Sequence, residues 1–155
     1  RILEPRAAAP QRRLRTIRAL ADAGIPVGVS VAPQIPFINE DMEQVLDAAR
    51  QAGAQSAFYT VLRLPWEINA LFQQWLQLHY PQRAERVMAR VRDMRGGKDY
   101  DSAWGQRMKG DGLWADLLRQ RFEKTCAKLG LNRVRHELDL SQFAPPGLNG
   151  QAQLF

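Results

Sequence analysis

The sequence has few of the residues that form disulfides or bind metals. Cys126 is its one cysteine, which excludes an internal disulfide and leads us to expect a reducing, cytoplasmic compartment. His79 and His136 are its two histidines, and they lack the spacing of metal ligands, so we predict no metal site in this chain. The sequence also contains no Ser-His-Asp pattern, phosphate loop or dinucleotide-binding fingerprint.

Long hydrophobic runs are also missing from the sequence. No 18 consecutive residues are apolar, so we expect no membrane span and no membrane partner. The N-terminal residues do not have the pattern of a signal peptide. The chain begins without methionine, in residues that look like the end of a strand, and we therefore expect it to be a piece of a longer protein.

The net charge of +6 is unevenly distributed. Residues 83–155 hold fourteen of the 22 basic residues but only nine of the 16 acidic ones. Such a basic half favours a polyanionic partner or an acidic neighbouring surface, and it is equally typical of a solvated helical face.

One short apolar segment organises the N-terminal part of the chain. After a helix that ends at Gly24, large and small residues alternate in Val27, Gly28, Val29, Ser30, Val31 and Ala32. A strand without a polar face is typical of a parallel sheet that is buried on both sides. Its small side leaves room for close-packed backbone or a ligand. The loop 33–38 then lies at the carboxyl end of this strand, where α/β sheets bind ligands.

The same pattern recurs once. Ala23-Gly24-Ile25 is repeated as Ala52-Gly53-Ala54, 29 residues later, and a second apolar strand follows over 57–65. This period is typical of helix-strand units in a parallel sheet. We therefore predict a β-α-β-α-β portion over 1–65, a helical extension over 66–140 and an extended tail over 141–155.

Three parallel strands alone would make a small sheet with exposed edges. We therefore predict an α/β fold that is the C-terminal half of a partial (β/α) barrel with parallel strands, followed by the helical extension. A small free-standing sheet is the alternative.

Several segments resemble one protein family. They are Glu4-Pro5-Arg6, Ala23-Gly24-Ile25-Pro26-Val27, Ala32-Pro33-Gln34-Ile35-Pro36, Leu62-Arg63-Leu64-Pro65 and Arg107-Met108-Lys109-Gly110-Asp111-Gly112. Together they resemble the C-terminal half of radical S-adenosylmethionine (SAM) proteins, in particular the DNA repair photolyase-like branch, which is related to spore photoproduct lyase. The resemblance covers residues 1–140.

This resemblance implies an enzyme that uses SAM and a [4Fe-4S] cluster. In that family three cysteines in a Cys-x3-Cys-x2-Cys loop hold the cluster, and this sequence has only Cys126, on a predicted helix. We therefore expect this chain alone to be inactive. The resemblance implies that a missing N-terminal half of the barrel is its partner and supplies the cluster.

Five residues are candidates for binding SAM. Glu4 and Arg6 follow the first strand and suit the ribose or amino group and the carboxylate of the cofactor, or else form a local ion pair. Ser30 reaches either a ligand or the main chain. Gln34 lies in the loop where the resemblance implies a contact with adenine. Arg63 is a candidate for binding an anionic group of the ligand.

Two further groups are also candidates for function. Tyr59 is a possible relay for a radical or a proton, and the alternative is a core tyrosine with a bonded hydroxyl. A group of basic and aromatic residues could bind nucleic acid, because cations bind phosphates and aromatic rings stack on bases. An irregular loop that aromatic residues anchor to the domain has the same composition. The members of the group are Arg95, Lys98, Tyr100, Trp104, Arg107 and Lys109.

The last five residues resemble the pentapeptide by which bacterial DNA-repair proteins dock on the sliding clamp. Gln151 would fill a polar pocket of the clamp, and Leu154 and Phe155 a hydrophobic one. Three functions thus remain open: a portion of a radical SAM enzyme with a basic substrate surface, a non-catalytic module that binds nucleic acid or a partner, and another α/β barrel enzyme.

Overall fold

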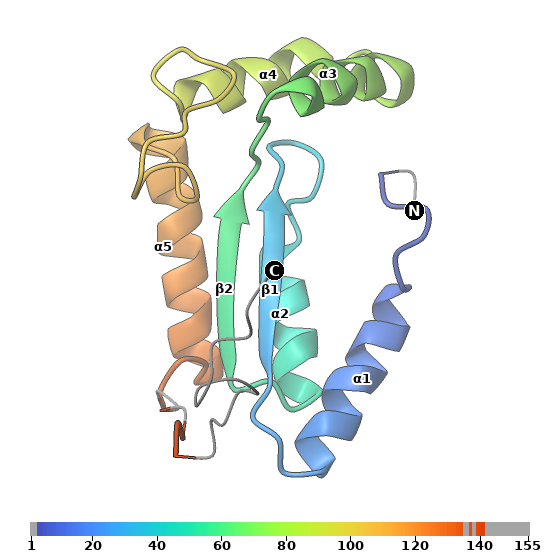
Figure 1. The fold of residues 1–155 in the computed structure, drawn as a ribbon, viewed down its shortest axis with the longest axis vertical. Coiled ribbons are helices and arrows are strands. Elements are labelled where there is room, and N and C mark those ends of the chain that lie inside the picture. Colours follow the sequence, from blue (N-terminus) through green and yellow to red (C-terminus); the bar gives the residue numbers. More distant parts are fainter. Residues whose placement is uncertain (1–2, 135–136, 138, 142–155) are drawn as a thin grey trace, which may run out of the picture.

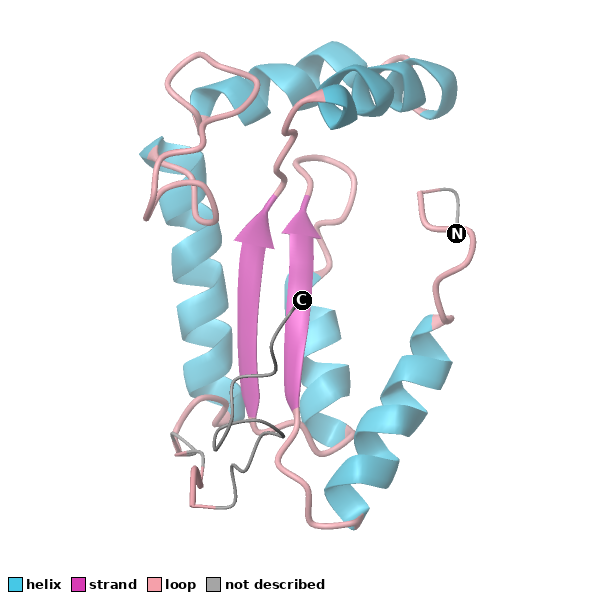
Figure 2. Cartoon of the chain, viewed as in Figure 1, coloured by secondary structure: helices cyan, strands magenta, loops and turns pink. Residues whose placement is uncertain are grey.

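The computed structural model describes residues 3–134, 137 and 139–141. Strands β1 and β2 form a two-stranded parallel sheet, in which Gly28 pairs with Ser56 and Val31 with Tyr59 (Figure 1). Figure 2 shows helices alongside the strands and further helices beyond the carboxyl ends of the strands. In chain order the elements are α1 (Pro10–Asp22), β1 (Gly28–Gln34), α2 (Met42–Gln51), β2 (Ser56–Val61), α3 (Glu67–His79), α4 (Ala84–Asp93) and α5 (Gly112–Leu129).

The helix boundaries follow from local chemistry. Pro10 lies in the first turn of α1. Backbone N–H groups there have no acceptor within the helix, so proline, which lacks an N–H, loses no hydrogen bond. At the start of α5, the Asp111 carboxylate accepts a hydrogen bond from the Gly112 amide. Gly130 ends the same helix in the left-handed conformation, at φ 69°. These two signals fix where α5 begins and ends.

The core consists of two clusters. The first packs α2 and α5 onto one face of the sheet, with Val31, Leu46, Val61 and Leu118 among its buried members. The second packs α3 onto α4 beyond the strand ends, around Leu76. The sheet therefore has a helical layer on one face and a helical cap at its carboxyl end.

The prediction of a partial barrel is wrong. The parallel β1-α2-β2 unit forms as expected, but the part of the chain that the structure describes contains two strands and no partial barrel. Residues 3–9, expected to begin with the end of a strand, form bends and turns instead. The architecture is a small α/β domain with five described helices.

The expectation that the sheet is buried on both faces is also wrong. Gly28, Ser30 and Ala32 are exposed on β1, and Phe58 is exposed on β2. Because α2 and α5 pack on the opposite face, no described helix covers these side chains. The small residues of β1 therefore line an open surface rather than a tightly packed interior.

Candidate functional site

The outer edge of β2 is closed by the chain itself. The Asn132 side chain accepts a hydrogen bond from the Ala57 amide at 2.8 Å and donates one to the Ala57 carbonyl at 3.0 Å. Further along, the Val61 amide donates to the Met108 carbonyl at 2.9 Å. Because these groups occupy the backbone edge of β2, a further strand cannot pair there.

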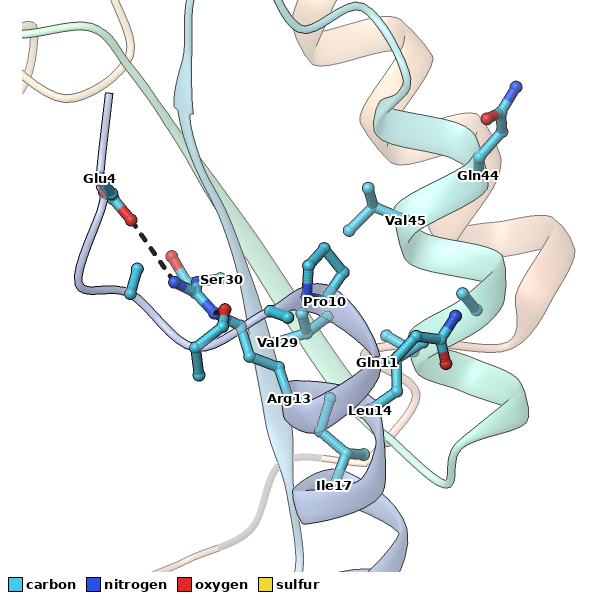
Figure 3. A pocket seen from close by; sticks show the side chains of 15 residues that line it. Glu4, Pro10, Gln11, Arg13, Leu14, Ile17, Val29, Ser30, Gln44 and Val45 are labelled. Carbon is cyan, nitrogen blue, oxygen red and sulfur yellow. Dashed lines mark hydrogen bonds and ion pairs between the residues drawn. The ribbon is translucent and has the colours of Figure 1, made fainter. Parts of the chain in front are cut away.

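The edge of β1 is different, because among the described residues β1 pairs with β2 alone. A cavity of about 510 Å³ lies between α1, β1 and α2, as Figure 3 shows. Its walls are mainly apolar, and its polar residues Gln11 and Gln44 lie apart from Glu4 and Arg13. The lining includes Glu4, Arg13, Leu14, Ile17, Val29, Ser30 and Val45.

Glu4 and Ser30, two of the predicted SAM-binding residues, both line this cavity. Glu4 already has a partner that the sequence analysis missed, because its carboxylate forms an ion pair with Arg13 at 3.4 Å (Figure 3). The Arg13 guanidinium also donates to the Ala8 carbonyl at 3.0 Å, which fixes it beside the cavity. Arg6 is exposed and is not part of the lining.

Gln34 faces away from this cavity. Its side chain is buried, and its amide donates to the Val31 carbonyl at 3.0 Å. In the loop that follows, Asn39 accepts from the Ile35 amide and donates to the Pro33 carbonyl. Both amides therefore shape the turn after β1, so the structure does not bring Gln34 together with Glu4 and Ser30.

Arg63 lies beyond β2, against the long loop that joins α4 to α5. It donates to the Tyr100 hydroxyl at 3.2 Å and to the Met108 sulfur at 3.5 Å, while its buried Nε has no partner. Its guanidinium also lies 5.9 Å from the centre of the Tyr100 ring. Arg63 thus joins the predicted basic and aromatic group rather than the other proposed SAM ligands.

Arg95 belongs to that group in sequence but points inward. It is 4% exposed, and it donates to the carbonyls of Leu62 and Gln106, each at 3.0 Å. Burial lowers the pKa of Arg95, and the nearby charge of Arg63 lowers it further. Arg95 therefore ties the loop to the end of β2, and its donors are not directed at an external phosphate.

The rest of the basic and aromatic group lies on the surface. Trp104 is 85% exposed, and the Arg107 guanidinium lies 4.4 Å from the centre of its ring. Lys98 and Lys109 are exposed on the same loop. An exposed indole beside one arginine, on a loop that carries two exposed lysines, provides a stacking surface with charge for a phosphate backbone.

Tyr59 is partly buried and packs against the first core cluster. Its ring centre is 4.8 Å from that of Phe122 on α5, and burial, followed by the charge of Glu123, raises its pKa.

The tail residues Gln151, Leu154 and Phe155 lie outside the described residues, so sliding-clamp binding stays a prediction.

Cys126 does not fit the ligation of an iron-sulfur cluster. It lies buried on α5, and burial raises the pKa of its thiol, whereas a cluster needs several thiolates. Within the described ranges, no group of three His, Cys, Asp or Glu side chains is arranged to hold a metal ion. No described helix combines the length and apolarity needed to cross a membrane.

Comparison with known proteins adds one partial similarity. Neither a family model nor a solved structure matches the chain. In an alignment of 67 positions that covers 39% of this chain, the chain is 34% identical to the "Uncharacterized protein ORF301" of Acidianus two-tailed virus. The match covers 22% of that viral protein.

Proposed function

We propose that this chain is the C-terminal portion of a radical SAM enzyme and that it contributes contacts to SAM. The observation that carries the proposal is that Glu4 and Ser30, distant in sequence, line one cavity of about 510 Å³. The motifs that resemble the family include both Glu4 and the loop after β1. Because Cys126 does not fit a cluster, the cluster thiolates are assigned to residues outside this chain.

The chain's own residues would bind and orient the cofactor. The Glu4 carboxylate suits ribose hydroxyls or an amino group, and Arg13, rather than Arg6, suits the carboxylate of the methionine part. Ser30 offers a hydroxyl on the exposed face of β1. When reduced by a cluster, SAM is a source of a 5′-deoxyadenosyl radical that removes a substrate hydrogen.

Isothermal titration of the 155-residue chain with SAM and with S-adenosylhomocysteine tests this proposal. Glu4→Gln and Ser30→Leu should each weaken binding about tenfold, the equivalent of one lost hydrogen bond. Ser102→Leu is the matched control for Ser30→Leu, because Ser102 is an exposed serine on the loop between α4 and α5. Absence of binding, or equal losses in the control, would contradict the proposal.

We infer a second candidate function, which is binding of single-stranded nucleic acid. The observation that favours it is the exposed Trp104 ring with Arg107 beside it, flanked by Lys98 and Lys109. Base stacking on an aromatic ring and neutralisation of phosphates are the two interactions that such binding needs. This surface would serve either a binding module or the substrate side of the enzyme.

A salt titration of oligonucleotide binding, followed by fluorescence anisotropy, tests the second function. Trp104→Ala should raise the dissociation constant about tenfold, whereas Trp66→Ala should not, although both indoles are about equally exposed, at 85% and 86%. Arg107→Ala should lower the slope of log affinity against log salt by about 0.7. Binding that is insensitive to salt would exclude this function.

A further inference from the structure

Three arginines form a row along one side of α4. Arg83, at the N-cap, is followed by Arg86 and Arg90 at intervals of three and four residues, which places their side chains above one another on the helix. Another side of α4, which includes Val87 and Val91, is buried in the second core cluster. The arginine row therefore lies on a side of α4 that the core does not use.

Each guanidinium of the row is held by a neighbouring segment. Arg83 donates to the Phe37 carbonyl at 2.9 Å, and the Arg86 guanidinium lies 3.9 Å from the centre of the Phe37 ring, in the loop after β1. The Arg90 guanidinium lies 5.2 Å from the centre of the Trp114 ring on α5. The two ring centres are 5.5 Å apart. The row is thus ordered before a ligand binds, which lowers the entropy cost of binding.

The positive charge of the row is largely uncompensated. Arg90 forms an ion pair with Asp93 at 2.7 Å, but the described residues provide no carboxylate partner for Arg83 or Arg86. On α5, by contrast, Arg119 pairs with acidic residues of its own helix. Because Arg83 and Arg86 are exposed, their remaining N–H groups can donate to an external anion.

The arrangement of these charges indicates the kind of anion. The ends of the row are seven residues apart, which is about 10 Å of helix, and one strand of a duplex carries about three phosphates over that length. The rings of Phe37 and Trp114 are partly buried and lie against the arginines, so the row provides no free ring for an unpaired base. We propose that the arginine row of α4 binds the phosphate backbone of a nucleic-acid duplex.

This surface goes beyond the single-strand binding proposed for the loop with Trp104. It lies on a different element, and it uses phosphate contacts alone, which position a duplex without reading its sequence. The row also supplies three of the fourteen basic residues in 83–155 and so gives a function to part of that excess. The two surfaces can therefore be tested separately.

Fluorescence anisotropy of the 155-residue chain with a labelled DNA duplex, at several salt concentrations, tests the proposal. Arg83→Gln and Arg86→Gln should each lower the slope of log affinity against log salt by about 0.9, because each removes one phosphate contact. Arg86→Lys should keep the slope, because an ammonium retains the charge. Circular dichroism confirms that the variants fold.

Arg15→Gln is the matched control. Arg15 is an exposed arginine on α1, which lies alongside the strands rather than beyond their ends (Figure 1), and the described residues provide no ion-pair partner for it. This variant should leave the slope unchanged. A loss equal to that of Arg86→Gln would mean that binding follows overall charge, and it would overturn the proposal.

Two further measurements separate the alternatives. Trp104→Ala should weaken binding of a single strand and leave the duplex slope unchanged, so failure of the single-strand function is distinct from failure of this one. A wild-type chain that does not bind duplex, or a slope that Arg86→Gln does not change, would overturn the proposal. Binding to phosphatidylserine vesicles without binding to duplex would overturn it in favour of an anionic membrane surface.

Discussion

Asn132 binds both backbone groups of Ala57, although 75 residues separate the two in the chain. One side-chain amide thus replaces the hydrogen bonds that a neighbouring strand would make. The contact fixes the segment after α5 against the start of β2, and it explains why the sheet does not extend in that direction.

Replacement of Asn132 should therefore destabilise the fold. Asn132→Gly removes both hydrogen bonds, leaves the Ala57 groups unpaired, and should cost about 2 kcal/mol in the free energy of unfolding. Asn132→Ala should cost more, because residue 132 has a φ of 60° that alanine adopts poorly. Urea denaturation measures both free energies of unfolding. Equal stabilities of the two variants would contradict the expected backbone strain of alanine at position 132.

A pair of glycines provides a second prediction. Gly53 follows α2 at a φ of 108°, and a Cβ added there would lie 2.5 Å from the Cβ of Ala21 on α1. Gly24 has a φ of 75°, but nothing lies within 4 Å of the added atom. Gly24→Ala should cost about 1 kcal/mol from backbone strain alone, and Gly53→Ala clearly more. Thermal unfolding distinguishes the two, and equal losses would exclude a close α1–α2 approach.

The pair Glu43 and Arg121 makes stability depend on pH. Arg121 donates to both carboxylate oxygens, each at 2.7 Å, and these hydrogen bonds lower the pKa of Glu43 from its ordinary 4.5. Its contribution is therefore complete above about pH 4.5 and is lost as the pH falls through the lower folded value. Because both side chains are partly exposed, the pair should contribute about 1 kcal/mol.

Unfolding of Glu43→Gln at several pH values measures this effect. The difference from the wild-type protein should be largest near neutral pH and should vanish in acid. Glu123→Gln is a suitable control, because Glu123 forms a more exposed pair with Arg119 at 3.6 Å and should change stability less. A difference that persists unchanged to pH 2 would contradict the role of the pair.

Arg95 should act on stability rather than on nucleic-acid binding. Arg95→Met leaves the carbonyls of Leu62 and Gln106 without their donors and should cost about 2 kcal/mol. Arg95→Lys should lose less stability than Arg95→Met, because an ammonium can still donate to one of the two carbonyls. It should not restore the full stability, because it reaches fewer acceptors than a guanidinium. Urea midpoints measure the loss, and the salt slope of oligonucleotide binding should not change. A reduced slope would mean that Arg95 contacts phosphate.

Local signals in the sequence predicted the elements better than their assembly. The helix expected to end at Gly24 and two of the three expected parallel strands are present. Asn39 is of a residue type that often caps helices, but it closes the loop after β1, and helix α2 begins at Met42. β2 ends at Val61, four residues before the expected end, because Leu62 and Leu64 enter the second core cluster.

The barrel was mispredicted because a short apolar strand looks the same whether one or both of its faces are covered. The candidate site was only partly predictable for a related reason. Glu4 and Ser30 were identified from their positions near strands, but Arg13 lies on a helix and meets Glu4 only because residues 3–9 turn back towards α1. Contacts of this kind depend on tertiary structure, which periodicity does not encode.

No residue of α1 is buried, and this helix forms one wall of the cavity beside β1. Its attachments to the rest of the protein are few, among them the contact of Ala21 with Gly53 and the hydrogen bond from Arg18 to the Gln51 carbonyl. Since detaching α1 exposes little apolar surface, it should open locally at a much lower free energy than α2 or α5. Amide hydrogen exchange would then be fastest in this helix, and the cavity would widen or narrow without unfolding of the sheet.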